Sequence, residues 1–280
     1  IDHLLNVNLL SSLSYCSPKC FITLNPSKLL IPHWDLELIT SELMDCLHGK
    51  TKRLIINVPP HFLKSISVNV AFVAFYLGHF PEKQIMSISY GQELADKHAA
   101  DCMRIMDSEW YKALFPRTRI ATKRKQISDF STTRGGGRIS TSMTGVMTGR
   151  GADLIILDDP IKAQEGLSEK ARQAVNEVYS SSILSRLNSQ VHGIIIIVMQ
   201  RLHQDDLCGY VLEKEVGRWN HVCLSVIAED DETFTYNGLT GPVTRKRQKG
   251  TSLNPAYSRW NGHVFFGLKK SEGKTERRVA

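Results

Sequence analysis

The stretch Leu54–Ser65, which reads LIINVPPHFLKS, decides how this chain is expected to fold. Its first part, Leu54–Val58, is a short apolar run of the kind that a buried parallel strand shows. The stretch leads into an apolar segment, Ile66–Leu77, which Gly78 and Pro81 bring to an end, and this pattern predicts a helix. We therefore expect a strand, a tight loop and a helix in succession.

A strand, a loop and a helix that begins with Lys64 and Ser65 are the parts of a phosphate-binding loop. In such a loop, backbone N–H groups and the helix N-terminus face an anion, the lysine reaches the β- and γ-phosphates, and the hydroxyl binds Mg²⁺. The sequence thus predicts ATP and Mg²⁺ as cofactors, with Ser65 as a metal ligand. We expect six residues to contact the nucleotide: Pro60, His61, Phe62, Leu63, Lys64 and Ser65.

The loop departs from the usual glycine-rich pattern. Val58 and Leu63 stand where the pattern G-x-x-x-x-G-K-[ST] places its glycines. Pro59 and Pro60 have no N–H, so the amides that can bind an anion begin at His61. Taken alone, the stretch is better explained as an ordinary strand-to-helix turn. The phosphate-loop interpretation therefore depends on residues further along the chain.

Two later apolar runs end in polar residues. Leu154–Leu157 is followed by Asp158 and Asp159, and Ile194–Met199 is followed by Gln200. A buried strand has this pattern when its carboxyl end carries functional groups, and open parallel sheets bind ligands at that edge. We therefore expect these polar residues and the Lys-Ser pair to gather at one edge of a sheet.

The predicted strands alternate with predicted helices. Strands are also expected over Gln84–Ser89 and Arg138–Met143, with loops or a β-ribbon over residues 117–138. Helices are expected over Leu36–Leu47, Gln92–Met106 and Ser168–Leu187, the last with Ser168 as its N-cap. This alternation predicts an α/β fold, a three-layer P-loop NTPase with a mostly parallel central sheet and helices on both faces.

The carboxylate pair is suited to nucleotide hydrolysis, which needs a held Mg²⁺ and a water aimed at the γ-phosphorus. Asp158 is the predicted metal ligand beside Ser65, acting through water because Mg²⁺ keeps much of its hydration shell. Asp159 points to a different side and is the predicted catalytic base that orients and deprotonates the water. The alternative for the pair is a helix N-cap or a structural turn before Pro160.

Three more residues are candidates for the site. Arg150, between two glycines, could stabilise charge on the γ-phosphate of its own or a neighbouring subunit, and is otherwise a solvated arginine. Gln200 could sense the γ-phosphate by hydrogen bonding, and is otherwise a satisfied glutamine at a strand end. Trp34 could stack on the nucleotide base, and is otherwise a buried core residue.

Composition narrows the class of protein. Hydrophobic residues make up 42% and charged residues 22%, as in ordinary globular proteins. No apolar run approaches the roughly 20 residues of a membrane span, and the N-terminus lacks the order of a secretory signal, which predicts an intracellular protein. The six cysteines are too widely spread for a zinc module, so we expect reduced thiols and no metal site at them.

The positive charge is concentrated at the C-terminal end. Thr244–Ala280 holds ten lysines and arginines against two acidic residues, whereas the whole chain has 35 against 28. The remainder of the chain is therefore close to neutral. A basic tail suits attraction to a nucleic-acid backbone, and it suits a solvated, disordered end as well.

The motifs, taken in order, resemble the ATPase half of the large terminase subunit of tailed bacteriophages and prophages. The resemblance covers roughly residues 20–258 and rests on four segments: VPPHFLKS at 58–65, TGRGADLIILDDP at 148–160, LSRL at 184–187 and VMQRLHQDDL at 198–207. Each motif is modest alone, and the ordered set is specific.

The resemblance implies an ATP-driven motor that packages viral double-stranded DNA through a portal into a procapsid. It assigns the variant Walker A loop to Pro59–Ser65, the Walker B carboxylate to Asp158, the catalytic acid to Asp159 and a coupling segment to Met199–His203. It also implies a portal protein and a small terminase subunit as partners and a homo-oligomeric ring when active. The location implied is the host cytoplasm and, transiently, the portal vertex, with no membrane association.

The chain departs from the family at two places. His61 stands where the family often has arginine, which gives more weight to Arg150. The predicted domains are an extension over 1–32, the ATPase domain over 33–228, and a linker and basic tail over 229–280 in place of a complete nuclease domain. We expect no nuclease activity from this chain. Two other functions stay open: a silent prophage remnant that only binds nucleotide, DNA or a capsid partner, and a helicase-type ATPase.

Overall fold

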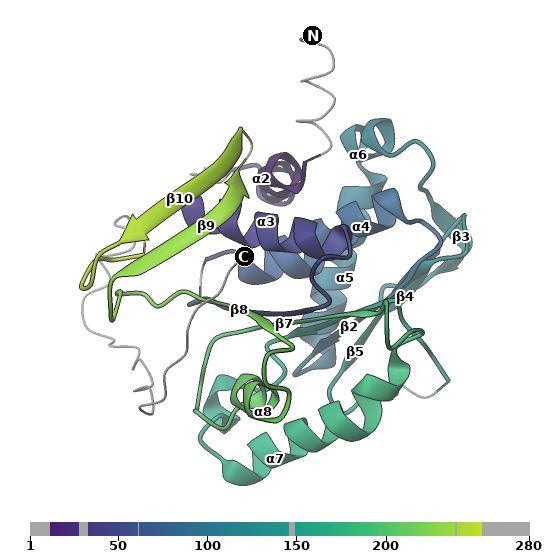
Figure 1. Cartoon of the computed structure of the whole chain (residues 1–280). Coiled ribbons are helices and arrows are strands. Elements are labelled where there is room, and N and C mark those ends of the chain that lie inside the picture. Colours follow the sequence, from purple (N-terminus) through teal and green to yellow (C-terminus); the bar gives the residue numbers. More distant parts are fainter. Residues whose placement is uncertain (1–11, 28–32, 61, 146–148, 239, 254–280) are drawn as a thin grey trace.

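The central element of the fold is a sheet of eight strands in the order β3-β4-β5-β2-β6-β7-β1-β8 (Figure 1). We use a computed structural model, which describes residues 12–27, 33–60, 62–145, 149–238 and 240–253. The strands are β1 (Arg53–Asn57), β2 (Gln84–Ser89), β3 (Ile120–Lys125), β4 (Asp129–Thr132), β5 (Gly137–Ser142), β6 (Leu154–Asp158), β7 (Ile194–Met199) and β8 (Asn220–Cys223).

The part of the sheet from β5 to β8 is parallel, and β3 and β4 extend it as an antiparallel ribbon. The strands β6 and β7 are buried on both faces, which explains why each reads as an uninterrupted apolar run. The predicted strands over Gln84–Ser89 and Ile194–Met199 have the observed bounds.

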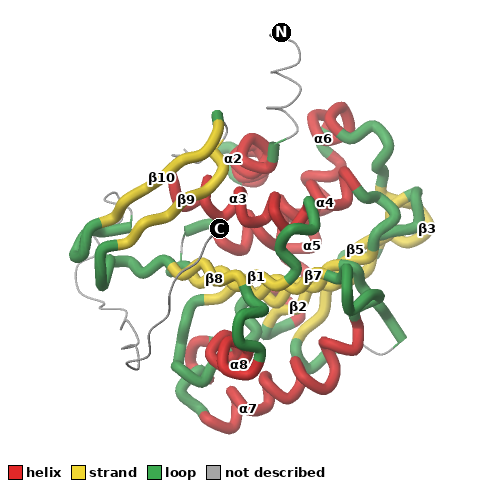
Figure 2. Tube along the Cα trace, viewed as in Figure 1, coloured by secondary structure: helices red, strands yellow, loops and turns green. Residues whose placement is uncertain are grey.

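Helices cover both faces of the sheet (Figure 2). One face carries α2 (Leu13–Leu24), α3 (Trp34–Leu47), the π-helix η1 (Ile66–Phe72), α4 (Val73–His79), α5 (Gln92–Asp107) and α6 (Glu109–Leu114). The other carries α7 (Glu169–Val178), the π-helix η3 (Tyr179–Ile183), the 3₁₀ turn η4 (Leu184–Arg186) and α8 (Leu207–Lys214); a second 3₁₀ turn, η2 (Ala163–Glu165), precedes α7. The predicted α/β fold, with a mostly parallel central sheet between two helical layers, is confirmed.

The helix that follows the organising loop is longer than predicted. It runs without a break from η1 into α4 and ends at His79, so Gly78 lies inside it and is not its end. A β-carbon at Gly78 would lie 2.6 Å from the ring of Phe115. The glycine is therefore needed for close packing of this ring against the helix, and the prediction that it ends the helix is wrong.

The predicted helix over Ser168–Leu187 has nearly the expected bounds, because helical turns run without a break from Glu169 to Arg186. The Ser168 hydroxyl accepts a hydrogen bond from the Ala171 amide, which confirms the N-cap. The type of helical turn changes along it: the α-helix α7 runs to Val178, and the π-helix η3 and the 3₁₀ turn η4 follow. The hydroxyls of Ser180 and Ser181 donate to backbone carbonyls one turn earlier, contacts that bend and loosen a helix.

A β-hairpin of β9 (Glu232–Gly238) and β10 (Gly241–Arg247) was not predicted. It packs on α3, where the Trp34 and Phe234 rings lie 5.4 Å apart and the Tyr236 hydroxyl donates to the Glu37 carboxylate. Arg247 is buried and paired with Glu232 at 3.1 Å, so this part of the basic segment is built into the fold. The rest of that segment, 254–280, lies outside the described residues.

The helix α2, the short helices α6 and α8 and the edge strand β8 were not predicted as elements either. The helix α2 precedes the predicted domain boundary at residue 33, yet Leu13, Cys16 and Cys20 belong to the same core as η1 and α5.

Two compositional expectations can be compared with the structure. Across the described ranges, no helix combines the length and the apolar character that crossing a bilayer requires. None of the six cysteines forms a disulfide bond, and five of them are buried.

We predict that Ile196→Ala, in the middle of β7, lowers the free energy of unfolding by about 2–5 kcal/mol, because it leaves a cavity between two buried layers. Val191→Ala, at a side chain that is 66% exposed, is the matched control and should change it by less than about 0.5 kcal/mol. Denaturant unfolding measures both. Equal losses in the two variants would contradict the central position of β7.

Candidate functional site

The sheet order brings the organising loop and the carboxylate pair to one edge. Strand β7 lies between β1 and β6, with Asn57 opposite Met199 and Asp158 opposite Val198. All three strands are parallel, so the loop after β1 and the carboxylates after β6 leave the sheet on either side of the end of β7.

Two side-chain contacts join these segments. The Lys64 ammonium lies 2.5 Å from Asp159 Oδ1, and the Ser65 hydroxyl donates to Asp158 Oδ1 at 2.9 Å. Lys64 and Asp158 are buried, whereas the Asp159 side chain keeps 28% of its exposure. A cation, a hydroxyl and two carboxylates thus form one compact cluster, with Asp159 nearest to solvent.

The carboxylate of Asp158 is held from both sides. Its Oδ2 accepts from the Asn69 side-chain amide at 3.0 Å and lies 3.3 Å from His98 Nδ1. Burial raises the pKa of Asp158, and the hydrogen bonds from Asn69 and Ser65 oppose that rise. Burial likewise lowers the pKa of His98 to about 4, so its ring is neutral at pH 7.

Asp159 lies in a different environment. Burial raises the pKa of its carboxyl, while the charge of Lys64 and the backbone N–H of Gln200 lower it. Gln200 therefore reaches the carboxylate through its backbone. Its side chain is half-buried, and among the described residues it makes no hydrogen bond that would fix its direction.

Strained backbone lies on both sides of the cluster. Within the described residues, Leu63 (φ 56°) and Asp159 (φ 44°) are the non-glycine residues in the left-handed region. Such residues cost about 1–3 kcal/mol and persist where the surrounding structure enforces them, often at functional sites. Leu63 stands where a phosphate-binding loop has its last glycine, and its backbone takes the conformation that glycine adopts easily.

The rest of the loop is partly described. Phe62 is buried and Pro60 half-buried, and the chain is helical from Lys64 onward, so the first amides of that helix point to the same edge as the carboxylates. His61 lies outside the described residues.

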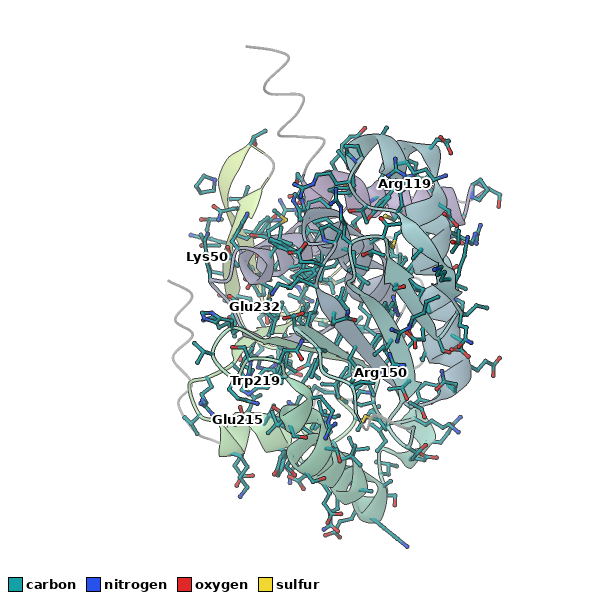
Figure 3. The ribbon with its side chains drawn as sticks, turned by 90° about the vertical axis from the view of Figure 1, so that its right-hand side faces the viewer. Lys50, Arg119, Arg150, Glu215, Trp219 and Glu232 are labelled. Carbon is teal, nitrogen blue, oxygen red and sulfur yellow. The ribbon has the colours of Figure 1, made fainter. Side chains whose placement is uncertain are left out.

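Arg150 does not join this cluster. Its guanidinium is paired with the Asp129 carboxylate on β4 at 2.9 Å, and Arg124 pairs with the same carboxylate. Three strand spacings, about 14 Å, separate β4 from β6. In Figure 3, Arg150 lies lower and to the right of Glu232, which belongs to the hairpin. Arg150 therefore does not reach the carboxylates of its own chain in this structure.

Trp34 lines a cavity of about 460 Å³ between the start of α3 and the hairpin. Lysine and arginine contribute three lining residues, and no aspartate or glutamate lines the cavity. The full lining is His33, Trp34, Arg245, Lys246, Arg247, Gln248, Thr251, Ser252 and Leu253. Arg247 donates to the carbonyl of Ser225, just beyond β8, and the Leu224 amide donates to Asn57 at the end of β1. The cavity thus lies at the same edge of the sheet as the organising loop.

The segment after β7 is a rigid turn. The buried Asp206 caps α8 by accepting from the Gly209 amide, and its second oxygen accepts from Arg201 Nε at 2.9 Å and from the Leu202 amide at 3.0 Å. This holds the predicted coupling segment, Met199–His203, directly beside the Asp159 carboxylate.

Sequence reasoning missed Asn69 and His98. The available signal was polarity on a buried face: Asn69 lies within the apolar helix after the loop and is fully buried, and His98 lies on the apolar side of α5. The Ser89 hydroxyl was missed as well. It is buried without a hydrogen-bond partner in the described structure, on the strand next to β6 and in register with Asp158.

The oxygen atoms of Ser65 and Asp158 suit Mg²⁺ better than a metal that is bound by protein ligands alone. The described residues contain no group of three or more His, Cys, Asp or Glu that could hold an ion. The Ser65 hydroxyl and the Asp158 carboxylate offer oxygen ligands, and the Ser89 hydroxyl could bind a coordinated water. Mg²⁺ is usually bound by one or two protein oxygens together with waters and substrate phosphates.

No protein-family profile matches the sequence, and a search of curated proteins finds no match. Among solved structures, the chain is similar to the crystal structure of the HK97 bacteriophage large terminase, with 14% identity and a TM-score of 0.48. The match covers 73% of this chain and 41% of that one, so the chain spans about two fifths of its length. Because identity and score are low, this similarity carries no argument about function.

We predict that Leu63→Gly leaves the free energy of unfolding within about 1 kcal/mol of the parent, since relief of strain offsets the lost side-chain contacts. Leu63→Val should lose about 1–2 kcal/mol more, because a β-branched residue is poorly tolerated in the left-handed region. Denaturant unfolding measures the free energy of unfolding of both variants. Leu167→Val, at an exposed leucine, is the control for replacing a leucine with a β-branched residue. A valine variant as stable as the glycine variant would show that the loop is unstrained.

Proposed function

We propose that this chain binds ATP with Mg²⁺ at the edge formed by Lys64, Ser65, Asp158 and Asp159, and hydrolyses it. The observation that carries the proposal is the meeting of a lysine, a serine and two carboxylates from segments about a hundred residues apart, at the carboxyl ends of parallel strands. Loop strain at Leu63, in the position of a glycine, points to the same kind of site.

The burial and contacts of each of these four residues indicate its role in hydrolysis. Ser65 and Asp158 would hold Mg²⁺, which when bound neutralises phosphate charge and stabilises the leaving oxygen. The Lys64 ammonium, which now contacts Asp159, is on a long flexible side chain and would turn to the phosphates of a bound nucleotide. That movement removes the cation from Asp159 and leaves its carboxylate, the more exposed of the two, to orient a water and accept its proton.

The base of the nucleotide is proposed to lie in the cavity beside Trp34. An indole ring can stack on a base, and Arg245 and Lys246 supply positive charge for the adjoining phosphates. This assignment supports ATP as a single ligand that spans the cavity and the loop, because both lie at one edge of the sheet.

The use to which hydrolysis is put is inferred from the four sequence segments that resemble large terminases. We propose that hydrolysis drives the movement of double-stranded DNA, as the resemblance to large terminases implies, with portal and small-subunit partners. The turn over Met199–His203 lies against Asp159 and is the proposed link between hydrolysis and movement. Arg150 is half-exposed and distant from its own site, so its proposed role is toward the site of a neighbouring copy in a ring.

We predict that Lys64→Ala lowers ATP turnover by about 100-fold or more, because the phosphates lose their main cation. Asp159→Asn keeps the shape of the side chain, removes the base, and should cost about 10²- to 10⁴-fold. Phosphate release with Mg²⁺, with and without duplex DNA, measures both, and removal of Mg²⁺ with a chelator should stop turnover.

The matched control is Lys83→Ala, because Lys83 pairs with Asp153 at the amino ends of the strands, away from the site. This variant should turn over ATP like the parent. No turnover by the parent under any DNA condition, with nucleotide still bound, would instead favour a silent nucleotide-binding remnant. Strand separation of a duplex would favour the helicase-type alternative.

We predict that Trp34→Ala weakens binding of a fluorescent ADP analogue by about tenfold, the effect expected for loss of one base–aromatic stack. Trp34→Phe keeps a ring against Phe234 and should bind within about threefold of the parent. Trp110→Ala, at a partly buried tryptophan on α6, is the control and should bind like the parent. Unchanged binding of the ADP analogue by Trp34→Ala would contradict the proposal that the base lies in this cavity.

A further inference from the structure

A buried guanidinium lies behind the carboxylate edge and has no part in the chemistry proposed above. Arg138, on β5, is 0% exposed, although arginine is almost never fully buried unless its donors are paired. Its Nη1 donates to the Asn69 backbone carbonyl at 2.6 Å, and its Nη2 donates to the Asn69 side-chain carbonyl at 2.9 Å. Two further donors reach the Ser87 hydroxyl from Nη2 and the Ser140 hydroxyl from Nε, and Cys102 is another hydrogen-bond partner of the guanidinium.

These contacts determine how the Asn69 amide is oriented. Its carbonyl oxygen accepts from Arg138 and from the Ser87 hydroxyl, so its NH₂ group must point the other way. There it donates to Asp158 Oδ2 at 3.0 Å and to His98 Nδ1 at 3.1 Å. The opposite rotation would set the NH₂ group against a guanidinium and the carbonyl oxygen against a carboxylate, and both contacts are repulsive.

The contacts of Asp158 show what this orientation achieves. Oδ2 is engaged by Asn69, while Oδ1 faces the Ser65 hydroxyl at the loop. A carboxylate held at one oxygen presents the other in a fixed direction, as outer-shell partners do for metal ligands in general.

We propose that Arg138 is a positioning residue, which fixes the amide of Asn69 and thereby the direction in which Asp158 presents its carboxylate to the loop. Its effect on cation binding rests on the function proposed above. The chain of contacts runs from β5 through the helix after the loop to β6, and Asn69 on that helix lies 69 residues from Arg138 and 89 residues from Asp158 in sequence.

Arg138→Lys separates this role from that of a buried counter-ion. Lysine keeps the positive charge, but its single nitrogen cannot span two carbonyl oxygens of Asn69 and two serine hydroxyls. If Arg138 acts only through charge, lysine should replace it. If it orients Asn69, lysine should not.

The first experiment needs no nucleotide. Thermal unfolding midpoints are measured for the parent, Arg138→Lys, Asp158→Asn and the double variant. We expect a non-additive result: Asp158→Asn changes the midpoint by clearly less in the lysine background, because the amide that it pairs with is already released. The same cycle with Arg172→Lys, at a buried arginine on α7 that donates to the Gly166 carbonyl, should be additive.

The second experiment measures Mn²⁺ binding in the presence of ADP by electron paramagnetic resonance. Arg138→Lys should weaken Mn²⁺ affinity by about tenfold or more, the usual effect of losing an outer-shell partner, and Arg172→Lys should not. An additive Arg138–Asp158 cycle would overturn the proposal, and so would unchanged Mn²⁺ affinity in a folded Arg138→Lys. A non-additive cycle in a parent that binds no Mn²⁺–ADP would support the positioning of Asp158 and contradict the proposed ATPase function.

Discussion

The ion pair between Lys64 and Asp159 is the contact on which the candidate site depends. It joins segments 95 residues apart, and it is possible because β1 and β6 are parallel and separated by one strand. Two cations and two carboxylates gather there, since Arg138 lies behind Asp158 as Lys64 lies beside Asp159. A buried cluster of balanced charge is tolerable only when its members are hydrogen-bonded, as these are.

The same contacts explain the strained and irregular backbone around the edge. Leu63 and Asp159 take left-handed conformations at the two chain segments that meet, and the helix between Lys64 and Val73 is widened into a π-helix. Irregular turns of this kind are common at functional sites. Asn69, within the π-helix, is thereby placed where it can contact both Arg138 and Asp158.

Much of the fold was predictable because buried parallel strands leave a strong signal. The runs over Leu154–Leu157 and Ile194–Met199 have no solvent-facing side and read as continuous apolar sequence. The hairpin was missed because its residues are mostly exposed and polar, and its pairing with α3 depends on Trp34 contacting a residue two hundred positions away. Gly78 was misread because a glycine required for packing looks the same in sequence as one that ends a helix.

The residues proposed to contact the nucleotide and Mg²⁺ were predictable from the sequence, whereas the buried residues that hold them in place were not. Lysine, serine and adjacent carboxylates after apolar runs are visible in sequence, whereas Arg138 and His98 acquire their place only through the packing of β5 and α5 against η1.

The most direct test of the central claim is a crystal structure with Mg²⁺ and a non-hydrolysable ATP analogue. The account predicts the phosphates at the helix start, with the Lys64 ammonium moved from Asp159 to the phosphates and Mg²⁺ beside Ser65 and Asp158. A nucleotide bound elsewhere, with the Lys64–Asp159 pair intact, would contradict it.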